Sequence, residues 1–452
     1  MSISRRRFIQ SLSCSGGALS LGLGSMGLFQ RQALAAEQSP KKMVFIFQEG
    51  GNDGINTIIP RGDSDYSLRT RPTLFIPEEE ALDSGNGFAQ FHPSLAPMME
   101  LYNRSSLNGQ NGLGNLAVLH RIGYEGQSRS HFDSQHYWQN GIPGDTETEE
   151  GFIYRRLNAA LDLGAAETGI VAAGLSSAQL LALKGEKLIP NFSSARDFNF
   201  PSGEKFLGIE PRRPDGLDAR GIRGLFALPP GKANRPYNSL VYQAGQSLSS
   251  TINVIQEAVG DDAYLPENGA VYPENRFGRK LMEAALLLKR TEMQVIGLQI
   301  GGWDTHQSQG RVSGSHPRLL GDVAQGFQAL ARDLKEQWDD TIIVTMTEFG
   351  RTSRENGSRG TDHAESSVMF VAGGKVNGGV YNCDETTWEE NAMFSERDRY
   401  LAARTDFRSV FGEIFEHHFG DDRQKMDEIM PGYSIAKIDN PSSFQSLGFL
   451  RA

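Results

Sequence analysis

The sequence predicts an α/β layered fold in which helices flank a mainly parallel central sheet. Two observations lead to this prediction. Short apolar runs recur along the chain, each too short for a helix and each followed by glycine or polar residues, which is typical of buried strands. Amphipathic helical patterns separate several of these runs, and strands that alternate with helices favour a parallel sheet. The predicted strands are 43–47, 116–120, 294–300, 341–346 and 368–372.

Three segments have the periodicity of helices that cover a sheet. Residues 316–338, between the third and fourth strands, place apolar side chains on one face and complete a βαβ unit. A second amphipathic pattern, around 277–288, precedes the third strand. A third, over 410–415, follows Thr405 and Asp406, which are suited to cap a helix.

The first 35 residues have the features of a twin-arginine export signal. Residues 5–7 are all arginine, residues 11–30 are uncharged and rich in Gly, Ser and Leu, and residues 33–35 fit a signal peptidase site. The alternative is an uncleaved anchor, but a spanning helix needs roughly 20 predominantly apolar residues. We therefore expect cleavage after Ala35, passage of the folded chain through the twin-arginine translocation machinery, and a periplasmic or extracellular location.

The composition of the remaining chain limits its partners and its means of stabilisation. Loss of residues 1–35 would leave 41 basic and 55 acidic residues, a formal charge of −14, which argues against nucleic acid as a partner. Cys383 would be the one remaining cysteine, so no internal disulfide is possible. We expect one large domain over 36–452, with an insertion or cap at about 176–272, where the pattern is less regular.

Acidic residues and histidines lie at the ends of several predicted strands. Asp53 follows the first strand, Asp304 and His306 follow the third, Glu348 follows the fourth, and His363 precedes the fifth. The active site of a parallel sheet lies outside the carboxyl ends of its strands, so these side chains should meet. Each alone also has a structural explanation, such as turn formation or an ion pair. Together they favour a divalent metal site, because gathered carboxylates repel one another unless a cation binds them.

A candidate nucleophile follows the second predicted strand. Residues 128–135, SRSHFDSQ, begin a stretch suited to a helix, with Ser130 near its N-terminus. The backbone N–H groups there favour an anion or an alkoxide, although a serine at this position can also be a plain helix cap. Arg129 and Arg351 are candidates for binding the non-bridging oxygens of a substrate.

Four motifs carry a family resemblance. Residues 48–60 (QEGGNDGINTIIP), 128–135 (SRSHFDSQ), 302–306 (GWDTH) and 348–363 (EFGRTSRENGSRGTDH) resemble the bacterial domain of unknown function 1501 family. That family is similar to the alkaline phosphatase and sulfatase superfamily. The resemblance implies an alkaline-phosphatase-like fold and hydrolysis of phosphate or sulfate esters by a nucleophile that one or two metal ions hold.

The resemblance also implies roles for individual residues. By motif order it makes Ser130 the nucleophile and assigns metal ligands to Asp53, Asp304, His306, Glu348, His363 and, as an extra, Asp362. The short spacing from Asp304 to His306 and the Glu348-Phe349 pair depart from alkaline phosphatases, so Zn²⁺, Mn²⁺, Ca²⁺ and Mg²⁺ and the number of ions stay open. A C/S-x-P-x-R motif is absent from the sequence, which excludes a formylglycine sulfatase.

The expected function is therefore secreted, metal-dependent hydrolysis of a small-molecule, glycan or lipid ester. Two alternatives use the same scaffold. One is a secreted binding or assembly protein without catalysis, since a fold does not determine a function. The other is a phosphotransferase or isomerase.

Overall fold

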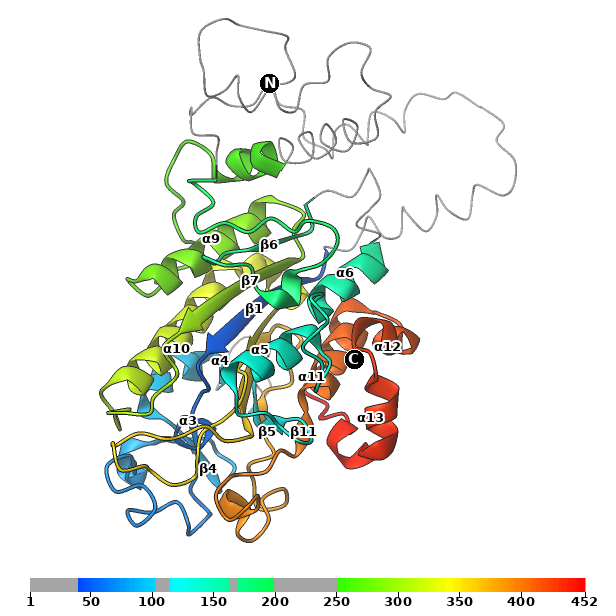
Figure 1. The fold of residues 1–452 in the computed structure, drawn as a ribbon. Helices are drawn as coiled ribbons and strands as arrows, with labels where there is room; N and C mark the ends of the chain where they lie inside the picture. The colour runs from blue at the N-terminus through cyan, green and yellow to red at the C-terminus, as the bar shows by residue number, and fades with distance from the viewer. Residues whose placement is uncertain (1–39, 103–113, 162–169, 199–250, 452) are drawn as a thin grey trace, which may run out of the picture. The chain divides into compact units, whose positions relative to one another are not determined.

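Within the described residues, which are 40–102, 114–161, 170–198 and 251–451, the computed structural model centres on an eight-stranded sheet. The strand order is β10-β5-β9-β8-β1-β7-β6, with β11 beside β5. Figure 1 labels the neighbouring strands β6, β7 and β1 of this sheet. The strands of this sheet are β1 (Lys42–Glu49), β5 (Leu116–Gly123), β6 (Ala172–Gly174), β7 (Val295–Gly301), β8 (Thr341–Met346), β9 (Ser367–Gly373), β10 (Gly379–Tyr381) and β11 (Thr405–Asp406). All five predicted strands are among them.

The sheet is mainly parallel, as predicted. β1 pairs in parallel with β7 on one side and β8 on the other, β6 continues the parallel order beyond β7, and β10 and β11 both run parallel to β5. β9 is the exception, because it pairs antiparallel with both β8 and β5. The start of β9 therefore lies at the edge where its neighbour β8 ends.

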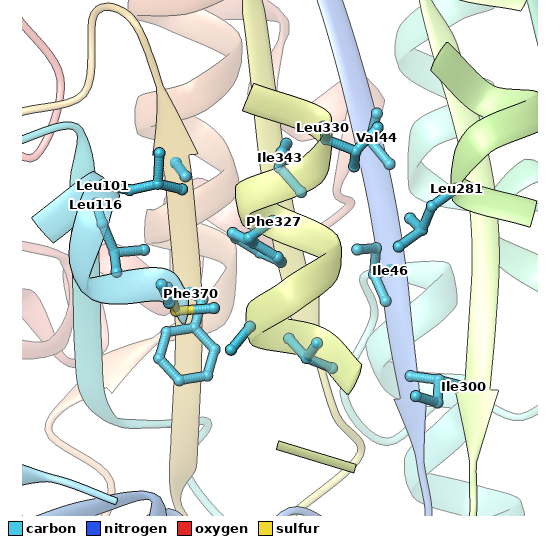
Figure 2. Close-up of a cluster of buried hydrophobic side chains, with 14 of the residues drawn as sticks. Val44, Ile46, Leu101, Leu116, Leu281, Ile300, Phe327, Leu330, Ile343 and Phe370 are labelled. Atoms are coloured by element: carbon cyan, nitrogen blue, oxygen red, sulfur yellow. The ribbon is translucent and has the colours of Figure 1, made fainter. Parts of the chain in front are cut away.

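Helices cover both faces of the sheet. On one face, α9 (Arg276–Arg290) and α10 (Ser315–Asp333) pack against alternate residues of β1, and Figure 2 shows Phe327 and Leu330 of α10 with Val44 and Ile46 of β1. On the other face, α6 (Phe152–Leu161) and α11 (Phe407–Glu413) pack against Phe45 and its neighbours. The alternation of β1 side chains between two apolar cores explains why its sequence is apolar at almost every position.

The predicted helices are confirmed, with differences at their ends. The α-helical part of 316–338 ends at Asp333, and Lys335–Asp340 continues as a 3₁₀ turn. The predicted cap of α11 is present, since a side-chain oxygen of Asp406 accepts a hydrogen bond from the backbone N–H of Arg408 at 2.9 Å.

The remaining elements are short. A second sheet of antiparallel strands consists of β2 (Ile58–Pro60), β4 (Ala89–Phe91) and β3 (Leu82–Asp83). The other α-helices are α3 (Gly54–Thr57), α4 (Met99–Tyr102), α5 (His131–Asn140), α12 (Met426–Ile429) and α13 (Tyr433–Asp439), and the described residues 251–259 are also α-helical. The 3₁₀ turns are Glu78–Glu80, Pro93–Met98, Leu181–Leu183, Ala392–Phe394, Arg423–Lys425 and Pro441–Phe444, and Ile414–Phe419 is a π-helical turn.

Two predictions about the ends and middle of the chain stay predictions. The expected export signal lies outside the described residues, and so do 199–250 of the expected insertion. In the described part of the chain, no helix has the length and apolar character needed to cross a membrane. The described residues from Lys41 onward form one compact unit.

Buried histidines make the stability of this unit depend on pH. Burial lowers the pKa of His92 and His418 to about 4 and that of His120 to about 3, from an ordinary value of 6.5. Below pH 6.5 the unfolded chain binds protons at these positions while the folded chain does not, so the free energy of unfolding should fall as the pH drops towards 4. Each histidine contributes about 1.4 kcal/mol per pH unit in that range.

His418→Gln tests this expectation, because the His418 ring contacts the carbonyl of Lys42 at 3.0 Å inside the core. Urea unfolding between pH 7 and pH 4.5 should show a shallower pH dependence for this variant than for the wild type. His417→Gln, at the exposed neighbouring position, is the matched control. Equal slopes for the wild type and His418→Gln would contradict the prediction.

Candidate metal centre

Loops from distant parts of the sequence meet at the carboxyl edge of β1, β7 and β8. The loop after β7 carries Asp304 and His306, and the segment before β9 carries His363. The loop after β1 comes so close that a Cβ atom on Gly50 would lie 2.4 Å from the backbone nitrogen of Asp304. Gly50 also has a φ of +124°, which favours glycine. A glycine is therefore needed at position 50, where the loop after β1 touches the loop after β7.

Three histidines gather around one carboxylate oxygen at this edge. Oδ1 of Asp304 lies 3.2 Å from Nε2 of His306, 3.2 Å from Nε2 of His363 and 3.6 Å from Nε2 of His131. Ligand atoms of His131, Asp304 and His363 lie within 4.8 Å of one another, and Nε2 of His306 is 2.9 Å from that of His363. We call these four residues the histidine cluster. Their donor atoms could hold a metal ion.

The other ring nitrogen of each histidine faces an oxygen acceptor. An ionised carboxylate or a carbonyl can only accept, so the tautomer that donates from Nδ1 satisfies these oxygens and leaves a lone pair on Nε2 of each neutral ring. Rings in this tautomer present three lone pairs to the histidine cluster. The Nδ1 partners are Glu348 Oε1 for His131 at 2.8 Å, Asp362 Oδ1 for His306 at 3.0 Å, and the carbonyl of Arg129 for His363 at 2.9 Å.

The charges around the cluster shift its pKa values in different directions. Partial burial favours a higher pKa for Asp304, but the hydrogen bond and charge of Arg351 outweigh it and lower that pKa to about 2. The hydrogen bond with Glu348 raises the pKa of His131, whereas burial lowers the pKa of His363. Asp304 is therefore an anion at neutral pH.

Glu348 lies beneath the cluster and is fully buried. Its Oε1 accepts hydrogen bonds from the backbone N–H of Gly50 at 2.9 Å and from Nε2 of Gln135 at 3.0 Å, in addition to the contact with His131. The hydroxyl of Thr347 lies 3.1 Å from its other oxygen. The predicted ligand Glu348 is thus close to the site, but its oxygens face these donors.

Arg351 is also buried, and its guanidinium connects the loops of the site. It donates to the carbonyls of Gly51 at 2.9 Å, Thr361 at 3.0 Å and Trp303 at 3.2 Å, and to Oδ1 of Asp304 at 2.6 Å. These partners use its donors, so Arg351 orients Asp304 and holds three loops together.

The contacts of Asp53 are with residues outside the histidine cluster. The Asp53 carboxylate is fully buried and forms a two-pronged ion pair with Arg71, with nitrogen to oxygen distances of 2.6 and 3.2 Å. Nε2 of Gln309 donates to the same carboxylate at 2.6 Å, and the backbone N–H of Asn56 donates at 3.3 Å. Asp53 therefore holds its own loop to Arg71, a partner that no motif in the sequence indicates.

Ser130 lies at the start of α5, beside the cluster in the chain. It is the N-cap residue of α5, and its Oγ accepts from the backbone N–H of Asp133 at 3.4 Å. The residues on either side both take part in the site, since the carbonyl of Arg129 contacts His363 and His131 belongs to the cluster. The Arg129 guanidinium lies 4.8 Å from the ring centre of Tyr400.

His131 was not among the residues predicted for the site from the sequence. A signal was nevertheless present, because the SRSHFDSQ motif places a histidine directly after Ser130, at the start of a helix that follows a strand. Asp362, in contrast, was expected as an extra ligand and lies on the outer edge of His306, with Arg399 at 3.2 Å from its second oxygen.

One comparison with known proteins agrees with the motifs at 302–306 and 348–363. The family model described as "Protein of unknown function (DUF1501)" matches residues 233–424, which confirms the family resemblance. None of the curated proteins matches the sequence. Solved structures similar to this chain include a sulfatase from Pseudoalteromonas sp., with 10% identity over 79% of this chain and 67% of that chain and a TM-score of 0.33. Another is the phosphonate monoester hydrolase of Agrobacterium radiobacter, with 10% identity over 83% of this chain and 73% of that chain and a TM-score of 0.27.

The buried pair of Asp53 and Arg71 should contribute strongly to stability. Asp53→Asn would leave the Arg71 charge buried without its counter-ion, and the free energy of unfolding should fall by about 3–5 kcal/mol. The double variant Asp53→Asn/Arg71→Met removes both charges and should recover part of the loss. Urea unfolding measures both effects, and an Asp53→Asn variant as stable as the wild type would contradict the structural role.

Proposed function

We propose that this protein is a metal-dependent hydrolase of phosphate or sulfate esters, with Ser130 as the nucleophile. One observation carries the proposal: three imidazole nitrogens and a carboxylate oxygen converge beside a serine that begins a helix. The motifs resemble the domain of unknown function 1501 family, and the similarity of that family to the alkaline phosphatase and sulfatase superfamily supplies the reaction class. The substrate would be a small-molecule, glycan or lipid ester.

The donor atoms of the cluster fit a divalent ion. Among the described residues, Nε2 of His131 is buried and has no hydrogen-bond partner, and Nε2 of His306 and of His363 lie only 2.9 Å apart. Lone pairs that face one another so closely repel unless a proton or a cation lies between them. A divalent ion held there would lower the pKa of a nearby hydroxyl and neutralise charge on the transferring group.

Ser130 would act in two steps. In the first, its Oγ forms a bond to the phosphorus or sulfur atom, the ester bond breaks, and the leaving alcohol takes up the serine proton. In the second, water adds to the seryl ester, the bond to Oγ breaks, Ser130 recovers its proton, and the free phosphate or sulfate leaves. The N-terminus of α5 favours the negative charge that develops at Oγ.

The two arginines would have different roles. Arg129 is partly exposed and forms no ion pair with any described residue, so its guanidinium is free to bind the non-bridging oxygens of a substrate. Arg351 is buried, and its donors already serve Asp304 and backbone carbonyls. We therefore assign it to the positioning of Asp304.

The proposal includes export through the twin-arginine route, on the basis of residues 1–35. Ligands that come from distant segments form a site only in the folded chain, so folding before export would let the metal bind first. Replacement of both Arg5 and Arg6 by Lys should leave the protein in the cytoplasm. Cell fractionation checks this, and normal export of that variant would contradict the assigned route.

Substitutions of Ser130 separate its catalytic role from its role as a helix cap. Asn caps helices as well as Ser does but cannot form the seryl ester, whereas Ala also loses the cap at a cost of about 1 kcal/mol. Both Ser130→Asn and Ser130→Ala should reduce turnover of aryl phosphates, aryl sulfates and phosphonate esters by roughly 10³-fold or more. The metal content of the Asn variant should stay unchanged.

Steady-state assays with these three ester classes give the comparison, and Ser442→Ala, at an exposed serine whose hydroxyl contacts Asn440, is the control. A Ser130→Asn variant as active as the wild type would make Ser130 a cap only. Absence of turnover by the wild type for all three classes would overturn the proposed function.

A further inference from the structure

We infer that the histidine cluster takes one ion of the zinc-like transition metals, and that Glu348 and Asp362 position its ligands without binding the ion. This inference rests on the metal site of the proposed function, although it does not depend on ester hydrolysis. Of the four ions that the sequence leaves open, it favours Zn²⁺ over Ca²⁺ and Mg²⁺. It also gives two predicted ligands, Glu348 and Asp362, a positioning role instead. Three structural observations lead to it.

The first observation is the chemistry of the converging atoms. Three of the four are imidazole nitrogens, from His131, His306 and His363, and one is a carboxylate oxygen, from Asp304. Calcium and magnesium bind oxygen ligands, whereas imidazole suits zinc and its neighbours in the first transition series. A set with three nitrogens therefore favours an ion such as Zn²⁺ or Co²⁺ over Ca²⁺ or Mg²⁺.

The second observation is where Glu348 and Asp362 lie. Each carboxylate contacts Nδ1 of a histidine whose Nε2 faces the cluster. Nδ1 and Nε2 are on different edges of the imidazole ring, so a carboxylate at Nδ1 stands behind the ring as seen from the ion. The same oxygen of Glu348 also accepts from Gly50 and Gln135, and Asp362 also accepts from Asn356 and Arg399.

This arrangement gives the two carboxylates a defined effect. By accepting a hydrogen bond from Nδ1–H, they fix the tautomer and orientation of His131 and His306 and increase the basicity of Nε2. Loss of such a partner typically weakens metal binding 10- to 100-fold, whereas loss of a ligand removes a bond to the ion. The two roles therefore predict different affinities.

The third observation concerns the number of ions. Asp53 is the remaining carboxylate that the sequence assigned to the site, and the buried guanidinium of Arg71 already neutralises it. Arg71 also donates to the carbonyls of Thr352 at 2.9 Å and Ser353 at 3.0 Å, so its position beside Asp53 is fixed by the fold. Within the described residues, the candidate group of three metal-ligating side chains, His131, Asp304 and His363, belongs to the histidine cluster. One ion is therefore expected.

Metal titration of the full-length protein after chelator treatment tests the class and the number. Calorimetry with Zn²⁺, Co²⁺, Mn²⁺, Ca²⁺ and Mg²⁺ should give one Zn²⁺ or one Co²⁺ per chain, and these two should bind at least 100-fold more tightly than Ca²⁺ or Mg²⁺. The absorption spectrum of the Co²⁺ form reports its nitrogen ligands. Two ions per chain, or a preference for Ca²⁺ or Mg²⁺, would overturn the inference.

Variants test the positioning role. His363→Ala should abolish tight Zn²⁺ binding, whereas Glu348→Gln and Asp362→Asn should still bind one ion with an affinity reduced roughly 10- to 100-fold. His136→Ala is the matched control, because this histidine is also on α5 but contacts the carbonyl of Thr148. Its Zn²⁺ affinity should equal that of the wild type.

Loss of Zn²⁺ binding in Asp362→Asn equal to that in His363→Ala would make Asp362 a ligand and refute the positioning role. Asp362 is partly exposed, so this variant keeps the test valid if Glu348→Gln fails to fold. The two proposals can fail separately. Binding of one Zn²⁺ without turnover of any ester would uphold this inference and refute the hydrolase, whereas turnover with two bound ions would do the reverse.

Discussion

The site depends on one buried cation, the guanidinium of Arg351. It joins the loop after β1, the loop after β7 and the segment before β9 through backbone carbonyls, and it fixes Asp304 by a direct ion pair. A buried charge is costly unless it is paired and fully hydrogen-bonded, so the loops cannot separate without exposing or stranding it. This constraint keeps the histidine cluster in place even though its members come from different segments.

The direction of β9 explains how the cluster is assembled. A chain segment that enters an antiparallel strand arrives at the edge where the parallel neighbours end. His363 thereby reaches the same edge as Asp304, although β9 and β7 are separated in the sheet by β8 and β1. A sheet of only parallel strands would place the segment before β9 at the opposite edge. Within the main sheet, the antiparallel strand β9 thus brings His363 to an edge that a parallel strand in its place would not allow it to reach.

The sequence predicted the strands and their meeting edge because both depend on local patterns. Apolar runs, glycines and polar residues at strand ends are visible without a structure, and Asp304, His306 and His363 were found in this way. The partners of these residues were not predictable in the same manner. Arg71 pairs with Asp53 and Glu348 lies behind His131 because of tertiary packing between distant segments, and no spacing in the sequence records that packing. The sequence can therefore predict that a carboxylate lies at a strand end, but it cannot predict which partner that carboxylate contacts.

The close approach at Gly50 limits how this sequence can change over evolution. A methyl group there would overlap the backbone at Asp304, and the backbone angle already disfavours any other residue. Unlike a side-chain ligand, which another donor could replace, this contact is between two main chains and has no chemical substitute. Gly50 should therefore change less often among descendants of this sequence than the residues of the histidine cluster, and its loss would mark a lineage in which the site has been abandoned.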